Sequence, residues 1–242
     1  MIEKHFSSKL SRNRCHESAD YTDMHSSDPQ LDAVIAATRH IPESNFTAYR
    51  GGYPQEISTA LIDAVFSIQA KYDSATPGKG VRNRVQVFRS AHPDVVNSLS
   101  ALVDLGVERL VQIMGSGKTG RRLKAGAVLE AAAGYAALGV DSADDFRSLD
   151  PVTVRPIYTN VQGLGYVTFE YFTMLLGIPG VKTDIMVKRF IAEALSSAGL
   201  ENVDAKRTRQ LVEEAHFATC LGKDLTHFEH AIWLSQSRPS KD

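Results

Sequence analysis

The sequence has only two cysteines, Cys15 and Cys220, and it lacks any long apolar run. Because the cysteines lie so far apart, they offer neither a disulfide framework nor the spacing of zinc ligands, and we expect a reducing compartment. There is no run of about 18 apolar residues to span a membrane, and residues 1–20 are too polar for a secretory signal. The sequence therefore predicts a cytoplasmic protein that has no membrane contact.

An excess of positive charge is absent too. The formal net charge is −1 and the isoelectric point is near 6.7, whereas domains that bind nucleic acid often lie above about pI 9. Contacts with phosphate would therefore have to come from local clusters. The first cluster holds Lys118, Arg121, Arg122 and Lys124, and the second holds Lys182, Lys188 and Arg189 around Asp184. A charge run is often only a solvated helix face. That alternative stays open for the first cluster, whereas for the second we favour a DNA contact.

Convincing alternating strands are missing as well, and the apolar residues, 43% of the chain, recur with helical spacing. A chain of 242 residues buries a sizeable core as one domain or as two joined lobes. A first helix is expected from Asp28 onward, and the others at 57–72, 82–89, 93–103, 107–113, 123–137, 142–148, 154–162, 168–176, 183–198, 204–219 and 225–235. We predict an all-α fold, preceded by a loose polar tail over residues 1–28.

The most informative segment is the turn Gly163-Leu164-Gly165, which lies between two of the predicted helices. In such a turn the missing side chains let backbone N–H groups approach a phosphate beside a positive helix N-terminus. This arrangement binds the nucleic-acid backbone without reading the bases. Asp184 follows one helix later, and the connection is long enough for its carboxylate to return to the same face as the turn.

At these residues the chain resembles the helix-hairpin-helix (HhH-GPD) DNA glycosylases of the endonuclease III superfamily. That family carries a Gly-Val-Gly-x-Lys-Thr-Ala hairpin, followed by a Val-Asp-Thr-His-Val-x-Arg segment with the catalytic aspartate. The corresponding segments here read GLGYVTF at 163–169 and TDIMVKR at 183–189, so the resemblance implies that Asp184 is catalytic. In bifunctional members the hairpin lysine forms a Schiff base with the sugar. Val167 stands in its place, which implies a monofunctional enzyme, and the cysteine count implies no iron–sulfur cluster.

The likeness runs from about residue 56 to residue 235. The segment at 64–70 is similar to a helix end of the family whose glutamine fills the gap left by a flipped base, so Gln69 is the candidate wedge. GRRLKA at 120–125 is similar to a segment within the helical barrel of the family. The implied fold has two lobes, one formed by residues 29–55 and 180–242 and the other by 56–179, with the hairpin at 161–168. The implied partner is double-stranded DNA, bound by a monomer without a cofactor. Its contacts would come from Gly163, Gly165, Gln69, Tyr166, Thr168, Lys182, Lys188 and Arg189.

Asp184 also has a purely structural explanation, since an acidic residue at a helix start accepts free backbone N–H groups. The two roles are compatible, because a capping aspartate is held rigid and ionised. Cleavage of an N-glycosidic bond builds positive charge on the sugar, which a fixed carboxylate stabilises. Aromatic faces could hold a cationic alkylated base, and conceivable lining residues are Phe66, Tyr72, Tyr166 and Trp233. Oxidised, deaminated and phage-type modified bases are equally compatible with these residues.

Three rival motifs are weaker. PGVKT at 179–183 is also similar to a hairpin of the family and would make Asp204 catalytic, but the helix after Asp204 lacks the apolar pattern that follows Asp184. GSGKT at 115–119 looks like the end of a phosphate-binding P-loop, yet Gln112 stands where that motif needs glycine. His216, His227 and His230 could suggest a metal site, but no acidic residue or cysteine stands near them in a pattern typical of metal ligands.

Two alternative functions stay open beside the glycosylase. The first is a DNA-binding protein that has lost catalysis, which the missing hairpin lysine would explain. The second is a glycosylase with lyase activity that uses another lysine, and Lys182 is the nearest to Asp184 in sequence.

Overall fold

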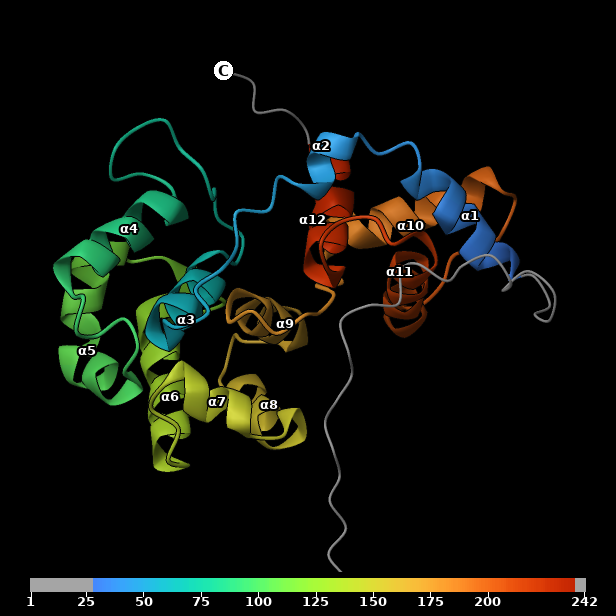
Figure 1. Ribbon diagram of the computed structural model, residues 1–242. Helices are drawn as coiled ribbons and strands as arrows, with labels where there is room; N and C mark the ends of the chain where they lie inside the picture. Colours follow the sequence, from blue (N-terminus) through green and yellow to red (C-terminus); the bar gives the residue numbers. More distant parts are fainter. Residues whose placement is uncertain (1–27, 238–242) are drawn as a thin grey trace, which may run out of the picture.

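The computed structural model describes residues 28–237, and the tail expected at 1–28 lies outside this range except for Asp28. Within the described range the fold is helical, as predicted, with twelve helices and one very short pair of strands (Figure 1). The elements are α1 Pro29–Thr38, α2 Glu43–Phe46, α3 Ile57–Phe66, α4 Val81–Ala91, α5 Leu99–Met114, β1 Lys118–Thr119, β2 Arg122–Leu123, α6 Lys124–Ala137, α7 Ala143–Ser148, α8 Pro151–Thr159, α9 Tyr166–Leu175, α10 Ile185–Ser197, α11 Ala205–Thr219 and α12 Leu225–Gln236.

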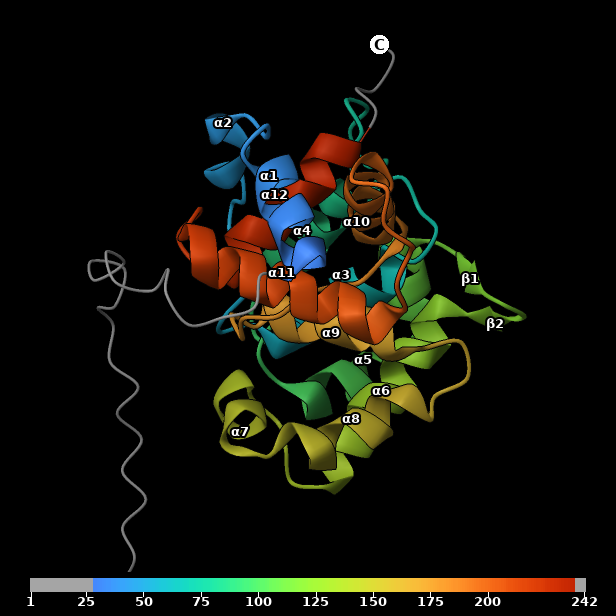
Figure 2. The same ribbon diagram turned by 90° about the vertical axis from the view of Figure 1, so that its right-hand side faces the viewer.

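One very short pair of strands, which the sequence did not indicate, accompanies the helices. β1 and β2 pair antiparallel, with Lys118 opposite Leu123 and Thr119 opposite Arg122, and this hairpin projects from the side of the molecule (Figure 2). Gly120 allows the tight turn between them because its φ is +59°. The two strands are only two residues long each, so they are too short to show an alternating pattern in the sequence.

Helix α2 was not expected from the sequence, and α8 begins and ends three residues earlier than expected. Two further differences concern α5 and α3. The helices expected at 93–103 and 107–113 form the single element α5, which is broken at Gly106 with φ 81° and ψ 164°. The helix expected at 57–72 ends at Phe66, and Gln69 adopts a left-handed conformation with φ 48°. The buried Lys124 donates from Nζ to the carbonyl oxygens of Phe66 at 3.0 Å and Ile68 at 2.5 Å. These bonds satisfy carbonyls at the end of α3, so a tertiary contact ends the helix there.

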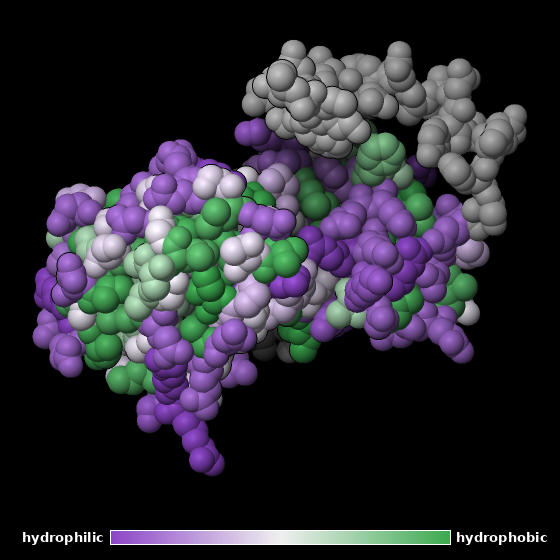
Figure 3. All heavy atoms as spheres, turned by 90° about the horizontal axis from the view of Figure 1, so that it is seen from below, coloured by the Kyte–Doolittle hydropathy of each residue, from purple (hydrophilic) through white to green (hydrophobic). Residues whose placement is uncertain are grey.

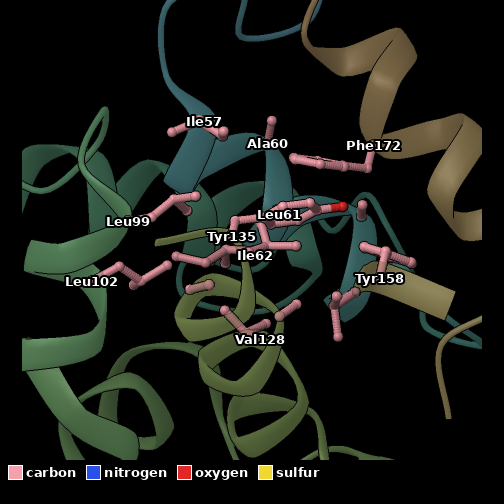
Figure 4. Packing of buried hydrophobic residues seen from close by; sticks show 14 of the residues in the cluster. Ile57, Ala60, Leu61, Ile62, Leu99, Leu102, Val128, Tyr135, Tyr158 and Phe172 are labelled. Carbon is pink, nitrogen blue, oxygen red and sulfur yellow. The ribbon is translucent and has the colours of Figure 1, made fainter. Parts of the chain in front are cut away.

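The buried apolar residues form two separate cores. The first is built from α3 to α9, with α3 at its centre, since all ten residues of α3 are buried. Figure 4 shows Leu61, Tyr135 and Phe172 meeting there from three helices. The second core joins α1 and α2 to α10, α11 and α12. Helices from both ends of the described chain therefore pack together, which Figure 1 shows as a separate group beside the first.

The chain passes between the cores twice, and the two connections lie side by side. The backbone N–H of Tyr53, in the connection from α2 to α3, donates to the carbonyl oxygen of Leu175 at the end of α9, at 2.5 Å. Gly52 is required at this contact, because a Cβ there would overlap the backbone of Leu175. Arg147 on α7 donates to the carbonyls of both Pro54 and Leu176. After this crossing, the segment that leads into α10 lies beside α9, where Lys182 contacts Tyr171.

Polar and apolar residues are interspersed on the lower face of the molecule (Figure 3). None of the helices between residues 28 and 237 combines the length and apolarity needed to cross a membrane.

Candidate active site

Asp184 caps the N-terminus of α10, and its two carboxylate oxygens have separate partners. Oδ1 accepts from the backbone N–H groups of Met186 at 2.8 Å and Val187 at 3.2 Å. Oδ2 accepts from the indole Nε1–H of Trp233 at 3.1 Å and lies 3.9 Å from Nζ of Lys182. The N-terminus of α10 and the Lys182 ammonium therefore lie on either side of this carboxylate. These contacts hold Asp184 rigidly, with its Oδ2 toward Trp233 and Lys182.

Lys182 connects Asp184 to a polar cluster on the first core. Its Nζ lies 4.0 Å from the ring centroid of Tyr171, a cation–π contact. The hydroxyl of Tyr171 donates to Asp63 Oδ1 at 3.3 Å. Asp63 lies on α3 and is fully buried, and it accepts three further bonds, from Tyr53 at 3.0 Å, Tyr72 at 2.8 Å and Ser67 at 3.0 Å. Lys182 and Asp184 thus lie where groups from both cores meet.

Burial sets the protonation of this tyrosine cluster. It raises the pKa of Asp63, and the hydrogen bonds from the tyrosines and the serine oppose that rise. Burial, followed by the charge of Asp63, raises the pKa of Tyr53, Tyr72 and Tyr171 above the usual range. The three phenols are therefore protonated donors at neutral pH. The bond from the Tyr171 hydroxyl to Asp63 holds the Tyr171 ring under the Lys182 ammonium.

A second group of aromatic and titratable side chains comes from α12 and the segment after α2. The ring of His230 stacks on Trp233 with centroids 5.8 Å apart and planes at 10°. Tyr49 lies across this pair, with its ring 5.2 Å from that of His230 and 5.3 Å from that of His227. Glu229, one turn before Trp233, is 3% exposed. The rings of Tyr49, His227, His230 and Trp233 form an aromatic wall on the α12 side of Asp184, and Glu229 lies within it.

Two of the α12 groups have strongly shifted pKa values. Burial, with smaller contributions from His227 and Lys182, lowers the pKa of His230 to about 4. Burial raises the pKa of Glu229 to about 8; the Lys182 charge opposes this shift and the Asp184 charge adds to it. Both side chains are consequently neutral at pH 7, which leaves Lys182 and Asp184 as the charged pair in this part of the site.

The two glycines of the turn between α8 and α9 differ in their surroundings. Gly163 has φ +90°, and a Cβ there would lie 2.6 Å from Cγ2 of Thr119, whose hydroxyl donates to the Gly163 carbonyl at 2.7 Å. Gly165 is the N-cap of α9 in extended conformation, and no atom lies within 4 Å of the position of its missing Cβ. The hydroxyl of Thr168 accepts from the Gly165 N–H at 3.2 Å. Gly163 therefore maintains the fold of the turn, whereas Gly165 leaves open space in front of the α9 N-terminus.

Two arginines that the sequence analysis did not single out flank this turn. Arg155 on α8 lies 5.9 Å from the ring centroid of Tyr166, and Arg209 on α11 donates to the Tyr166 hydroxyl at 2.5 Å. Arg209 also pairs with Glu170 at 2.7 Å. Arg155 is close to the turn in sequence and could have been noticed, but only the packing of α11 brings Arg209 there.

The predicted site residues divide into those near Asp184 and those elsewhere. Lys182 and Trp233 contact Asp184 directly, and Tyr72 reaches the same region through Asp63. Lys188 is exposed on α10, whereas Arg189 is bonded to Met186 and to both the side chain and the carbonyl of Gln236. Of the remaining predicted residues, Gln69 is exposed after α3, Phe66 is buried in the first core, and Tyr166 and Thr168 begin α9.

The first cationic cluster is not a continuous charged surface. Lys118 and Arg121 are exposed in the β hairpin, but Arg122 pairs with Glu130 at 2.5 Å and Lys124 is buried. Asp204, the aspartate of the rival motif, is an exposed cap of α11 that accepts from the N–H of Arg207 at 2.7 Å. Within residues 28–237 no group of three or more His, Cys, Asp and Glu side chains is arranged to hold a metal ion.

The family model described as "Domain of unknown function (DUF8548)" matches residues 16–237. No curated protein matches the chain.

Proposed function

The chain belongs to the DUF8548 family, and we propose that it is a monofunctional DNA glycosylase that removes a damaged or modified base from double-stranded DNA in base excision repair. The observation that carries this proposal is the setting of Asp184. One of its oxygens is fixed by the N-terminus of α10, and the other faces Lys182 and an aromatic wall. We further propose that it acts as a monomer in the cytoplasm.

We infer that α8, the turn at 160–165 and α9 form the helix-hairpin-helix that grips the DNA backbone. The open space at Gly165 and the positive N-terminus of α9 support this inference, because a phosphate can approach the backbone there. The exposed Lys188 adds a charge near the start of α10. The two cores then correspond to the two lobes of a glycosylase, and Gln69, exposed at the end of α3, would enter the base stack in place of the flipped nucleotide.

The chemistry follows from the fixed carboxylate. When the bond between C1′ and the base nitrogen breaks, its electron pair leaves with the base and positive charge develops on the sugar. Asp184 Oδ2, held by Trp233, stabilises this charge at no cost in reorganisation. Water then bonds to C1′ and gives a proton to Asp184, the departing base takes up one proton, and Asp184 releases its own to solvent, which yields an abasic site and the free base. The amine of the bifunctional enzymes is missing from the hairpin, where Val167 stands, so the strand stays intact.

Asp184→Asn tests this role, and the chain offers a matched control. Asp204 caps α11 as Asp184 caps α10, but it is exposed. We expect Asp184→Asn to reduce base release by at least about 100-fold and to leave duplex affinity nearly unchanged, while Asp204→Asn keeps full activity. The assay incubates duplexes that each carry one modified base and then looks for strand breaks with and without alkali. Breaks that require alkali support the proposal. Salt-sensitive binding with no release from any duplex would instead indicate a DNA-binding protein without catalysis.

A second candidate function adds strand cleavage to base removal. The observation that favours it is the 3.9 Å separation between Lys182 Nζ and Asp184 Oδ2, which brings an amine to the proposed reaction centre. The neutral amine would attack C1′ and displace the base, which takes up the amine proton. The sugar ring would then open at O4′ to give an iminium ion, and loss of a proton from C2′ would expel the 3′ phosphate. Borohydride would then trap a covalent adduct in the wild type and in Lys223→Met, an exposed control, but not in Lys182→Met. No adduct with an abasic duplex removes this candidate and leaves the monofunctional enzyme.

A further inference from the structure

Glu229 is a buried acid that the mechanism above does not use. Its side chain is 3% exposed, and its Oε1 has no hydrogen-bond partner among residues 28–237. It lies on α12 one turn before Trp233, whose indole holds Asp184, so the two residues share a helix face. The hydroxyl of Tyr49, across the same wall, is likewise buried and has no partner in the described part of the chain. The aromatic wall therefore contains a carboxyl and a phenol with unused hydrogen-bonding capacity.

The charged and titratable groups around Glu229 come from several elements. The charges that act on the pKa of Glu229 are those of Lys182 and Asp184, which precede α10. Other charged and titratable groups on α12 or on the elements packed against it are Tyr49 after α2, Glu43 on α2, Arg189 and Glu193 on α10, His216 on α11, and Asp224, His227 and His230 at the start of and along α12 itself. Burial is the largest cause of the raised pKa of Glu229, about 8. The group consequently carries a proton at pH 7.

We propose that Glu229 is the general acid that protonates the departing base, and that the substrate is therefore a neutral base with an acceptor nitrogen or oxygen. This inference rests on the proposed glycosylase function. As the C1′–N bond breaks and its electron pair moves into the base, the O–H of Glu229 passes its proton to the acceptor atom. Glu229 is left as a carboxylate. Water gives a proton to Asp184, and this proton then passes through solvent to Glu229, which restores its acid form. The net reaction consumes one water and releases the protonated base.

The Tyr171 face of the site already carries a cation, which favours a neutral base over a cationic one at that face. Lys182 already places an ammonium group 4.0 Å from the Tyr171 centroid, so a cationic base would meet a like charge at that face. A cationic alkylated base also leaves without a proton, and it would gain nothing from a buried acid. A neutral base needs the proton, and it can stack on the uncharged rings of His230 and Trp233.

The test compares Glu229→Gln with Glu201→Gln, an exposed control, in single-turnover base release from duplexes that carry uracil, hypoxanthine, 8-oxoguanine or the cationic 7-methylguanine. We expect the wild type to release a neutral base, at a rate that falls as pH rises past about 8. Glu229→Gln should release the base about 100-fold more slowly, and its rate should no longer decline at alkaline pH. Its affinity for duplex should be unchanged. Glu201→Gln should behave as the wild type.

Three outcomes would overturn the inference. Glu229→Gln with the rate and pH profile of the wild type would remove Glu229 from the reaction while leaving the glycosylase intact. A wild type that prefers 7-methylguanine would refute the neutral substrate class. A wild type that releases no base from any duplex would refute the proposed function itself, and this inference with it. The wild-type pH profile needs no variant, so it tests the acid even if Glu229→Gln fails to fold.

Discussion

Replacing Glu229 with glutamine should stabilise the protein increasingly as pH rises. In the folded protein burial raises the pKa of this carboxyl from the ordinary 4.5 to about 8. Between these pH values the unfolded chain releases the proton and the folded protein keeps it. Because the folded state then binds more protons than the unfolded state, the free energy of unfolding of the wild type falls with rising pH. Glutamine has no such equilibrium and escapes this loss.

The magnitude follows from the same two pKa values. Each pH unit between them costs the wild type about 1.4 kcal/mol of stability. From pH 5.5 to pH 7.5 the stability of Glu229→Gln relative to the wild type should therefore increase by about 3 kcal/mol. This is a large part of the stability of an ordinary domain, about 5–15 kcal/mol.

Urea unfolding followed by circular dichroism at pH 5.5, 6.5 and 7.5 measures this difference. Glu201→Gln changes an exposed glutamate and should follow the wild type at every pH. If the difference between Glu229→Gln and the wild type stayed constant across the series, Glu229 would be ionised in the folded protein, and the reasoning from its burial would be refuted.

Two glycine variants should separate folding from DNA binding. Gly163→Ala should cost about 2 kcal/mol of stability, because the φ of Gly163 is +90° and the new Cβ would overlap Thr119. Gly165→Ala should keep its stability within about 0.5 kcal/mol of the wild type but bind duplex about tenfold more weakly. Urea unfolding and fluorescence anisotropy measure the two effects, and equal losses of stability would contradict the separate roles. Lys124→Met should cost about 2 kcal/mol because it removes both bonds to the end of α3, and an unchanged urea midpoint would show that those bonds contribute nothing.

Local sequence determined the helical fold and several features of the site. The caps are the clearest case, because Asp28 and Asp184 accept hydrogen bonds from backbone groups two and three residues ahead, a distance that a sequence pattern spans. The glycine turn before α9 is equally local. Gly163 has a positive φ of +90°, which favours glycine, and the space at Gly165 is open. An aspartate at the start of α10 was thus predictable as a cap, and resemblance to a family added the hypothesis of catalysis.

Only the tertiary structure decided what surrounds Asp184. Its bond from Trp233 joins residues 49 positions apart, and the bond from Tyr171 to Asp63 joins residues 108 positions apart. The same holds for Lys124, which looked like part of a charged surface and is buried against the end of α3. Glu229 gave no sign in the sequence, since a glutamate on an amphipathic helix is usually exposed. Its raised pKa comes from the packing of α12 against other helices, and no local pattern records which helix face that packing buries.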